Sequence, residues 1–87
     1  MRPKTILQTM SNRIEKAFSE VLGVPVEKIS DATSPENTPE WDSLQAMNLV
    51  VALEEAFDVK LSTKEIVSMR SVGLVRKVLR AKGIGDV

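Results

Sequence analysis

The tripeptide Asp42-Ser43-Leu44 is the place in this sequence where a single side chain could do chemistry. Ser43 stands where a long polar loop meets an amphipathic segment, so its hydroxyl lies at the expected N-terminus of a helix. Such a hydroxyl is usually an N-cap, because its oxygen accepts a backbone N–H that otherwise has no partner. The same position suits a covalently attached phosphate, since the unpaired N–H groups and the helix dipole both favour negative charge. We therefore expect Ser43 to act as a cap, as an attachment point, or as both.

The composition excludes most other chemistries. The 87 residues contain no cysteine and no histidine, which removes disulfides, His/Cys metal sites and every catalytic group of those two types. The sequence shows no nucleophile–base pair and no glycine-rich phosphate loop, so we predict a protein that is not an enzyme. The stretch from Asp31 to Asp42 has the length of an EF-hand loop, but Pro35 stands at its fifth position and Glu36 where glycine is needed. We therefore predict no calcium or other metal site.

The net charge is zero, but it is unevenly distributed. Eleven acidic and four basic residues lie between Glu15 and Glu65, whereas the tail from Arg70 to Lys82 is basic. The acidic middle argues against nucleic acid as a partner, and the basic tail is interpreted as the solvated face of a terminal helix. No apolar run reaches bilayer-spanning length and no signal-peptide pattern is present, so we expect a cytoplasmic protein without membrane insertion.

The apolar residues recur every three to four positions, which predicts helices, and no segment alternates as a strand would. The expected helices cover residues 5–22, 43–57, 62–68 and 71–81, the last three starting at Ser43, at Ser62 or Thr63, and at Ser71. Gly23 and Pro25 end the first helix, and Gly83 ends the last. We predict an all-α fold, a small four-helix bundle of three main helices and one short helix. It should form a single domain over residues 1–87 with an ordered core over about 5–82.

A long connection, residues 24–42, joins the first two helices and contains many turn-forming residues. Connections of this length are uncommon in a small domain and are often functional. Val26 and Ile29 are expected to anchor it to the core. Trp41, the only tryptophan, is expected to pack the end of the loop onto the core, because one aromatic side chain alone makes no binding platform.

The predicted helix over residues 43–57 carries two apolar stripes. One comprises Ala46, Leu49, Val50, Leu53 and Phe57, and the other comprises Leu44, Met47 and Val51. Such a helix is either largely buried, or it buries one stripe and offers the second to a partner. For Leu44 and Met47 we favour contact with a partner, because they lie beside Ser43 and methionine suits adaptable interfaces. Val51 fits either role, and Glu54 marks the polar side.

The tripeptide at this junction, with the sequence Leu-Val-Val-Ala-Leu-Glu-Glu-Ala-Phe-Asp-Val-Lys-Leu at residues 49–61, resembles an acyl carrier protein over nearly the whole chain. The resemblance implies that Ser43 carries 4′-phosphopantetheine, attached from coenzyme A by a separate phosphopantetheinyl transferase. The thiol of that arm would hold acyl cargo as a thioester for acyl-loading and acyl-processing enzymes. We expect five residues around this site to serve partner recognition: Asp42, Leu44, Met47, Val51 and Glu54.

Two features depart from the strongly acidic carriers of fatty acid synthesis. Gln45 and Asn48 occupy helix positions that are often acidic in those carriers, and Lys60 and Lys64 stand near the short helix. Steering by basic partner surfaces should be weaker here, which favours a specialised pathway such as polyketide, nonribosomal peptide or modified-lipid synthesis. We expect a monomer. The alternative is an unmodified helical interaction module in which Ser43 is only an N-cap.

Overall fold

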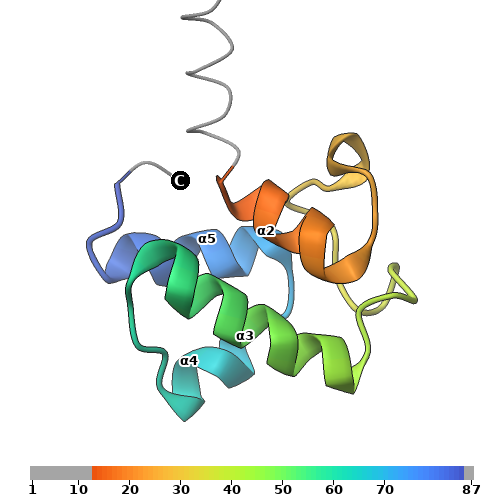
Figure 1. Ribbon diagram of the computed structural model, residues 1–87. Coiled ribbons are helices and arrows are strands. Elements are labelled where there is room, and N and C mark those ends of the chain that lie inside the picture. The colour runs from red at the N-terminus through yellow and green to blue at the C-terminus, as the bar shows by residue number, and fades with distance from the viewer. Residues whose placement is uncertain (1–12, 86–87) are drawn as a thin grey trace, which may run out of the picture.

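The computed structural model describes residues 13–85, and these form helices joined by loops, with no strand among them (Figure 1). The elements in chain order are α2 (Arg13–Leu22), the 3₁₀ turn η1 (Val26–Lys28), α3 (Ser43–Phe57), α4 (Thr63–Ser68) and α5 (Val72–Ala81). The all-α prediction with one short helix is confirmed. The predicted helical residues 5–12 lie outside the described residues, as do the two ends of the predicted single domain over residues 1–87.

The predicted ends of the helices agree with the structure. α2 ends at Leu22, and Gly23 follows with a φ of +72°, a left-handed conformation that glycine adopts without strain. The N–H of Gly23 donates to the carbonyl of Ser19 at 2.9 Å, which closes the last turn of the helix.

No helix in the described part of the chain is long and apolar enough to cross a bilayer.

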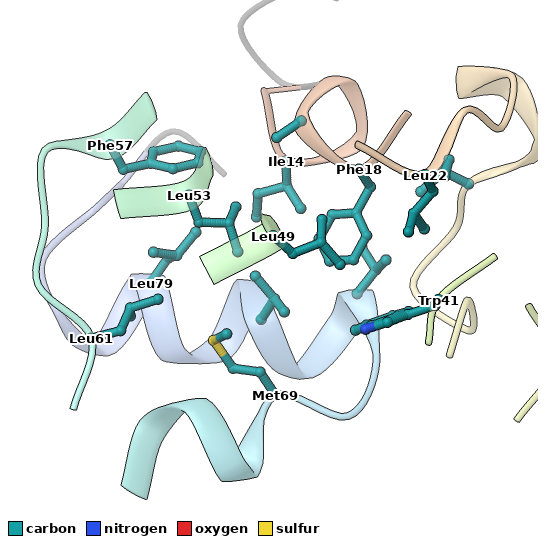
Figure 2. Close-up of a cluster of buried hydrophobic side chains, with 14 residues drawn as sticks. Ile14, Phe18, Leu22, Trp41, Leu49, Leu53, Phe57, Leu61, Met69 and Leu79 are labelled. Carbon is teal, nitrogen blue, oxygen red and sulfur yellow. The ribbon is translucent and has the colours of Figure 1, made fainter. Parts of the chain in front are cut away.

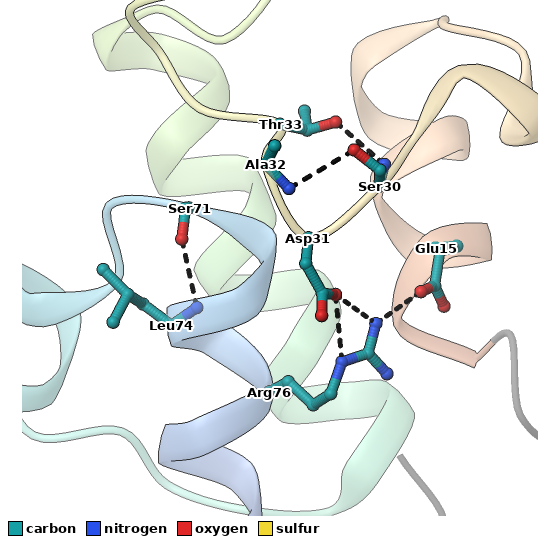
Figure 3. Close-up of polar contacts among 8 residues, drawn as sticks. All are labelled: Glu15, Ser30, Asp31, Ala32, Thr33, Ser71, Leu74 and Arg76. Atoms are coloured by element: carbon teal, nitrogen blue, oxygen red, sulfur yellow. Dashed lines mark hydrogen bonds and ion pairs between the residues drawn. The ribbon is translucent and has the colours of Figure 1, made fainter.

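Serine caps begin α4 and α5, as the sequence predicted. Ser62 Oγ accepts the N–H of Glu65 at 3.1 Å, and Glu65 Oε1 accepts the N–H of Ser62 at 2.8 Å, which makes a capping box. Ser71 Oγ accepts the N–H of Leu74 at 3.1 Å (Figure 3). These bonds satisfy N–H groups that the helices themselves leave unpaired, and so they fix where each helix starts.

One apolar cluster joins all the main helices (Figure 2). Its members come from α2, the long loop, α3, the connector after α3, the α4–α5 turn and α5: Ile14, Ala17, Phe18, Leu22, Ile29, Trp41, Leu49, Leu53, Phe57, Leu61, Met69, Val72, Val75 and Leu79. Full burial of a large apolar side chain contributes roughly 1.5–3 kcal/mol to folding. The predicted packing of Trp41 is confirmed, because its ring lies edge-on to Phe18 with 5.0 Å between centroids.

The first part of the long loop is fixed to α5 by backbone hydrogen bonds. The N–H of Val72 donates to the carbonyl of Thr33 at 3.0 Å, and the N–H of Gly73 donates to the carbonyl of Asp31 at 3.1 Å. A Cβ at position 73 would lie 3.2 Å from that same Asp31 oxygen, so a side chain there would push the loop away. Thr33 is buried, and its Oγ1 accepts the N–H of Ser30 at 2.9 Å.

An ion-pair cluster reinforces this attachment (Figure 3). The guanidinium of Arg76 on α5 donates to Asp31 Oδ1 in the loop and to Glu15 Oε2 on α2. The side chain of Arg76 is only 14% exposed, so the prediction that the basic residues of the tail form a solvated face is wrong at this position. Burial by itself would lower the pKa of Arg76, but its hydrogen bonds to Glu15 and Asp31 outweigh burial and raise it.

Candidate functional site

Ser43 is the first residue of α3, and Asp42 is its N-cap. Asp42 has extended backbone angles (φ −101°, ψ −173°), and its Oδ1 accepts the N–H of Gln45 at 2.9 Å. The prediction that Ser43 caps the helix is therefore wrong, because the capping oxygen must come from the extended residue before the first helical one. The Ser43 hydroxyl has no hydrogen-bond partner within residues 13–85, and the residue is exposed. Asp42 thus leaves this hydroxyl free.

The surroundings of that hydroxyl fit a phosphodiester. The backbone N–H groups of Ser43 and Leu44 have no acceptor among the described residues, because the cap satisfies the N–H of Gln45 and the Asp42 carbonyl accepts that of Ala46. Unpaired first-turn N–H groups and the positive end of the helix dipole both favour an anion attached at this residue.

A groove of about 390 Å³ opens beside Ser43. It is lined by residues from the loop, the start of α3 and the α4–α5 turn: Pro35, Trp41, Asp42, Ser43, Ala46, Met69 and Arg70. Most of these side chains are apolar, and Asp42 and Arg70 are the two charged residues of the lining. The groove is large enough to take part of a small flexible chain attached at the serine, because ligand pockets start at roughly 300 Å³.

A smaller cavity of about 40 Å³ lies deeper, within the core. It shares Trp41, Ala46 and Met69 with the groove, so the two are neighbours. This volume has room for a few water molecules and not for an acyl chain, given that one water needs at least about 10–15 Å³ measured in this way. A cargo longer than a few atoms can enter the core only if the side chains that line this cavity move apart.

The second apolar stripe of α3 is exposed. Leu44, Met47 and Val51 have 69%, 64% and 53% of their surfaces accessible, so the alternative that they complete the core is excluded. Val67 on α4 is 67% exposed. The sequence predicts Ile66 as the apolar contact of this short helix, and Ile66 does pack against the core, but the sequence gives no separate signal for the exposure of Val67.

Three polar residues on α3, Glu54, Gln45 and Asn48, make hydrogen bonds within the molecule. Glu54 is half-buried, and its Oε2 accepts the N–H of Leu61 at 2.9 Å. It therefore holds the connector after α3 in place, and its role in partner recognition stays a prediction. Gln45 is half-buried and Asn48 exposed, and Asn48 Nδ2 donates to Gln45 Oε1 at 2.9 Å. This part of the helix surface is neutral.

Comparison with known proteins decides the family. Residues 12–79 match the family described as "Phosphopantetheine attachment site". The chain is also 30% identical over 66 residues to the acyl carrier protein of Buchnera aphidicola subsp. Schizaphis graminum, a match that covers 76% of this chain and 84% of that protein. The chain belongs to the acyl carrier protein family. The resemblance stated from the sequence is confirmed.

Members of this family are carriers, and their cofactor is covalently attached 4′-phosphopantetheine. A phosphopantetheinyl transferase attaches that group, and acyl-processing enzymes act on what the carrier holds. The described residues of this carrier contain no cluster of three or more side chains that could hold a metal ion.

Proposed function

We propose that Ser43 bears the 4′-phosphopantetheine group and that the protein serves as a single-domain, monomeric carrier. The observation that supports this most directly is the free, exposed hydroxyl on the first residue of α3. When bound, the group supplies a thiol that holds an acyl chain as a thioester. Asp42 caps the helix, so the hydroxyl remains available, and the first-turn N–H groups lower the cost of the added negative charge.

The exposed stripe is the proposed contact surface for partner enzymes. Leu44 and Met47 lie in the first two turns of α3 and are among the most exposed apolar side chains of residues 13–85. A partner that binds Ser43 in its active site would cover them, and the burial of these apolar groups would stabilise the complex. Val51 would extend the contact along the helix, while the carboxylates of Asp42 and Glu54 would border it on the polar side.

We infer a specialised biosynthetic pathway, with polyketide, nonribosomal peptide and modified-lipid synthesis as the candidates. The neutral pair Gln45–Asn48 lies beside the apolar stripe, and Lys60 before α4 and Lys64 within it are exposed. A surface with so little concentrated charge attracts a basic partner less strongly over distance. Loading rates should accordingly fall less with added salt than they do for a strongly acidic carrier assayed with its own enzyme. A steep fall with salt would contradict this inference.

The attachment is tested by incubating the apo-protein with coenzyme A and a broad-specificity phosphopantetheinyl transferase and measuring the intact mass. We expect the mass to rise by one phosphopantetheine unit in the wild type and in Ser71→Ala, which removes another serine at a helix start. Ser43→Ala should remain unmodified. An unchanged wild-type mass, or modification of Ser43→Ala, would overturn the proposal and favour an unmodified interaction module.

A further inference from the structure

Arg70 is the one cationic residue among those lining the groove beside Ser43. Its guanidinium Nη2 donates to Glu36 Oε2 at 2.9 Å, across the loop. Both side chains are about two-thirds exposed, at 67% and 64%. An ion pair as exposed as this contributes little to stability, because water and salt screen it and two long side chains must be ordered. Arg70 can therefore exchange this partner for another at small cost.

A phosphodiester on Ser43 would create a need for a cation in this groove. It adds a negative charge next to Asp42, whose carboxylate is held in place by the cap bond to Gln45. Asp42 cannot turn away without losing that bond, and so the two negative charges would remain close together. The helix dipole offsets only part of this repulsion, since its effect amounts to about half a unit charge.

The backbone at Arg70 is anchored by its neighbours, whereas its side chain is exposed and held only by the ion pair with Glu36. Met69 and Val72 on either side are buried in the core, and Ser71 caps α5. From this anchored position the Arg70 side chain lines the same groove as Ser43. A planar guanidinium can donate two parallel hydrogen bonds to phosphate oxygens, which makes arginine better suited to this role than lysine.

We propose that Arg70 is a binding residue for the prosthetic group: on modification of Ser43 it leaves Glu36 and pairs with the phosphodiester. This inference rests on the proposed attachment at Ser43. It implies that modification holds the first atoms of the arm against the groove and releases Glu36 at the same time. In the unmodified protein the hydrogen bond from Arg70 holds the pKa of Glu36 below its ordinary value. Modification should therefore raise the pKa of Glu36 toward that value.

The test compares apo- and holo-forms of the wild type, Arg70→Gln, Arg70→Lys and Lys64→Gln. The last variant makes the same charge change at an exposed residue that does not line the groove. Intact mass confirms that each holo sample is fully modified. The readouts are the Arg70 Nε–Hε resonance, the ³¹P resonance of the phosphodiester as salt is added, and the difference in Tm between holo and apo.

In the wild type we expect the Nε–Hε resonance to shift on modification and the ³¹P resonance to respond to salt. In Arg70→Gln the ³¹P response to salt should disappear, and the holo-minus-apo difference in Tm should fall by about 2–5 °C. Arg70→Lys should lose part of this difference, and Lys64→Gln should behave as the wild type. If the modified wild type shows an unchanged Arg70 resonance, or if Arg70→Gln keeps both responses, Arg70 does not bind the phosphodiester. A wild type that cannot be modified would instead overturn the attachment at Ser43.

Discussion

Both apolar faces of α3 consist mainly of large apolar side chains, but one face is buried in the core and the other is exposed to solvent. Leu49, Leu53 and Phe57 are at most 5% exposed and pack in the cluster with α2 and α5 (Figure 2). Leu44 and Met47, on the same helix, are 69% and 64% exposed. Hydrophobicity along a helix therefore does not tell which face folds the protein and which face is presented to others. The difference arises from what the rest of the chain covers.

The loop before α3 also has one part that is fixed to the rest of the molecule and one part that is exposed. Its first part is attached to α5 through Asp31 and Thr33, and it leads to a second part in which Glu36 and Glu40 are exposed. Trp41 then returns the chain to the core immediately before Ser43. The attachment that we propose needs a serine that is both exposed and fixed in position, and the buried Trp41 just before Ser43 provides that fixed position.

Removing a buried leucine should give the largest effect. Leu53→Ala removes a side chain with 0% exposure and leaves a cavity, so the free energy of unfolding should fall by about 2–5 kcal/mol. Met47→Ala, on the exposed face, should change it by less than about 0.5 kcal/mol. Urea unfolding of the two apo-proteins measures both. If the two variants lose equal free energy of unfolding, the exposed face also supports the fold, and the two faces of α3 do not differ in this respect.

The second effect concerns the attachment of the loop to α5. Arg76→Met should lower the free energy of unfolding by about 1–3 kcal/mol, less than for a fully buried pair, because Asp31 is largely exposed. Most of the loss should come from Glu15, which is 16% exposed and would lose its ion-pair partner. Arg70→Met, at the exposed pair, is the matched control and should cost under about 1 kcal/mol in the apo-protein.

Replacing Glu15 by Gln in the Arg76→Met background provides a further check. If the cost comes from an unpaired carboxylate, this second substitution should recover part of the lost stability. No recovery in urea unfolding would place the cost in lost packing of the arginine side chain instead.

The exposed face should matter only when a partner binds. Leu44→Ala should leave the urea midpoint unchanged and lower kcat/KM for the phosphopantetheinyl transferase about tenfold, as expected for an apolar contact in the centre of an interface. Val67→Ala, an exposed apolar residue on α4, is the control and should change neither quantity. If Leu44→Ala is modified at the wild-type rate, this transferase does not use the exposed stripe.

Much of this arrangement could be predicted from the sequence, because the helices have local signals. Apolar spacing and the caps at Ser62 and Ser71 mark where α4 and α5 begin, and the tripeptide at residues 42–44 marks the candidate site. The sequence predicts Ser43 as the cap of α3, whereas the cap is Asp42. The two residues are adjacent, and both types are good caps. Only the backbone angles tell which one is extended and which one is helical.

The contacts between distant residues could not be predicted. Arg76 meets Glu15 and Asp31 across separations of 61 and 45 residues, and a charged residue on a helix is by default assigned to its solvated face. The pairing of Arg70 with Glu36 is of the same kind. Such contacts depend on how α5 packs against the loop. The spacing of apolar residues within one helix does not indicate how that helix packs against a distant segment.

The smallest effect is expected at Glu65, where α4 meets the end of α5. The N–H of Ser62 and the ammonium of Lys82 both donate to its carboxylate and lower its pKa below the ordinary value of 4.5. A lowered folded-state pKa stabilises the protein fully above that ordinary value, and this stabilisation is lost as the pH falls through the folded-state pKa. The difference in urea midpoint between the wild type and Glu65→Gln should therefore be constant at neutral pH and shrink only below about pH 4.5. Lys82→Met should reduce this pH dependence but leave some of it, since the bond from Ser62 remains. If the difference is the same at all pH values, the carboxylate charge has no part in holding α4, and the neutral capping bonds alone fix it on this side of the molecule.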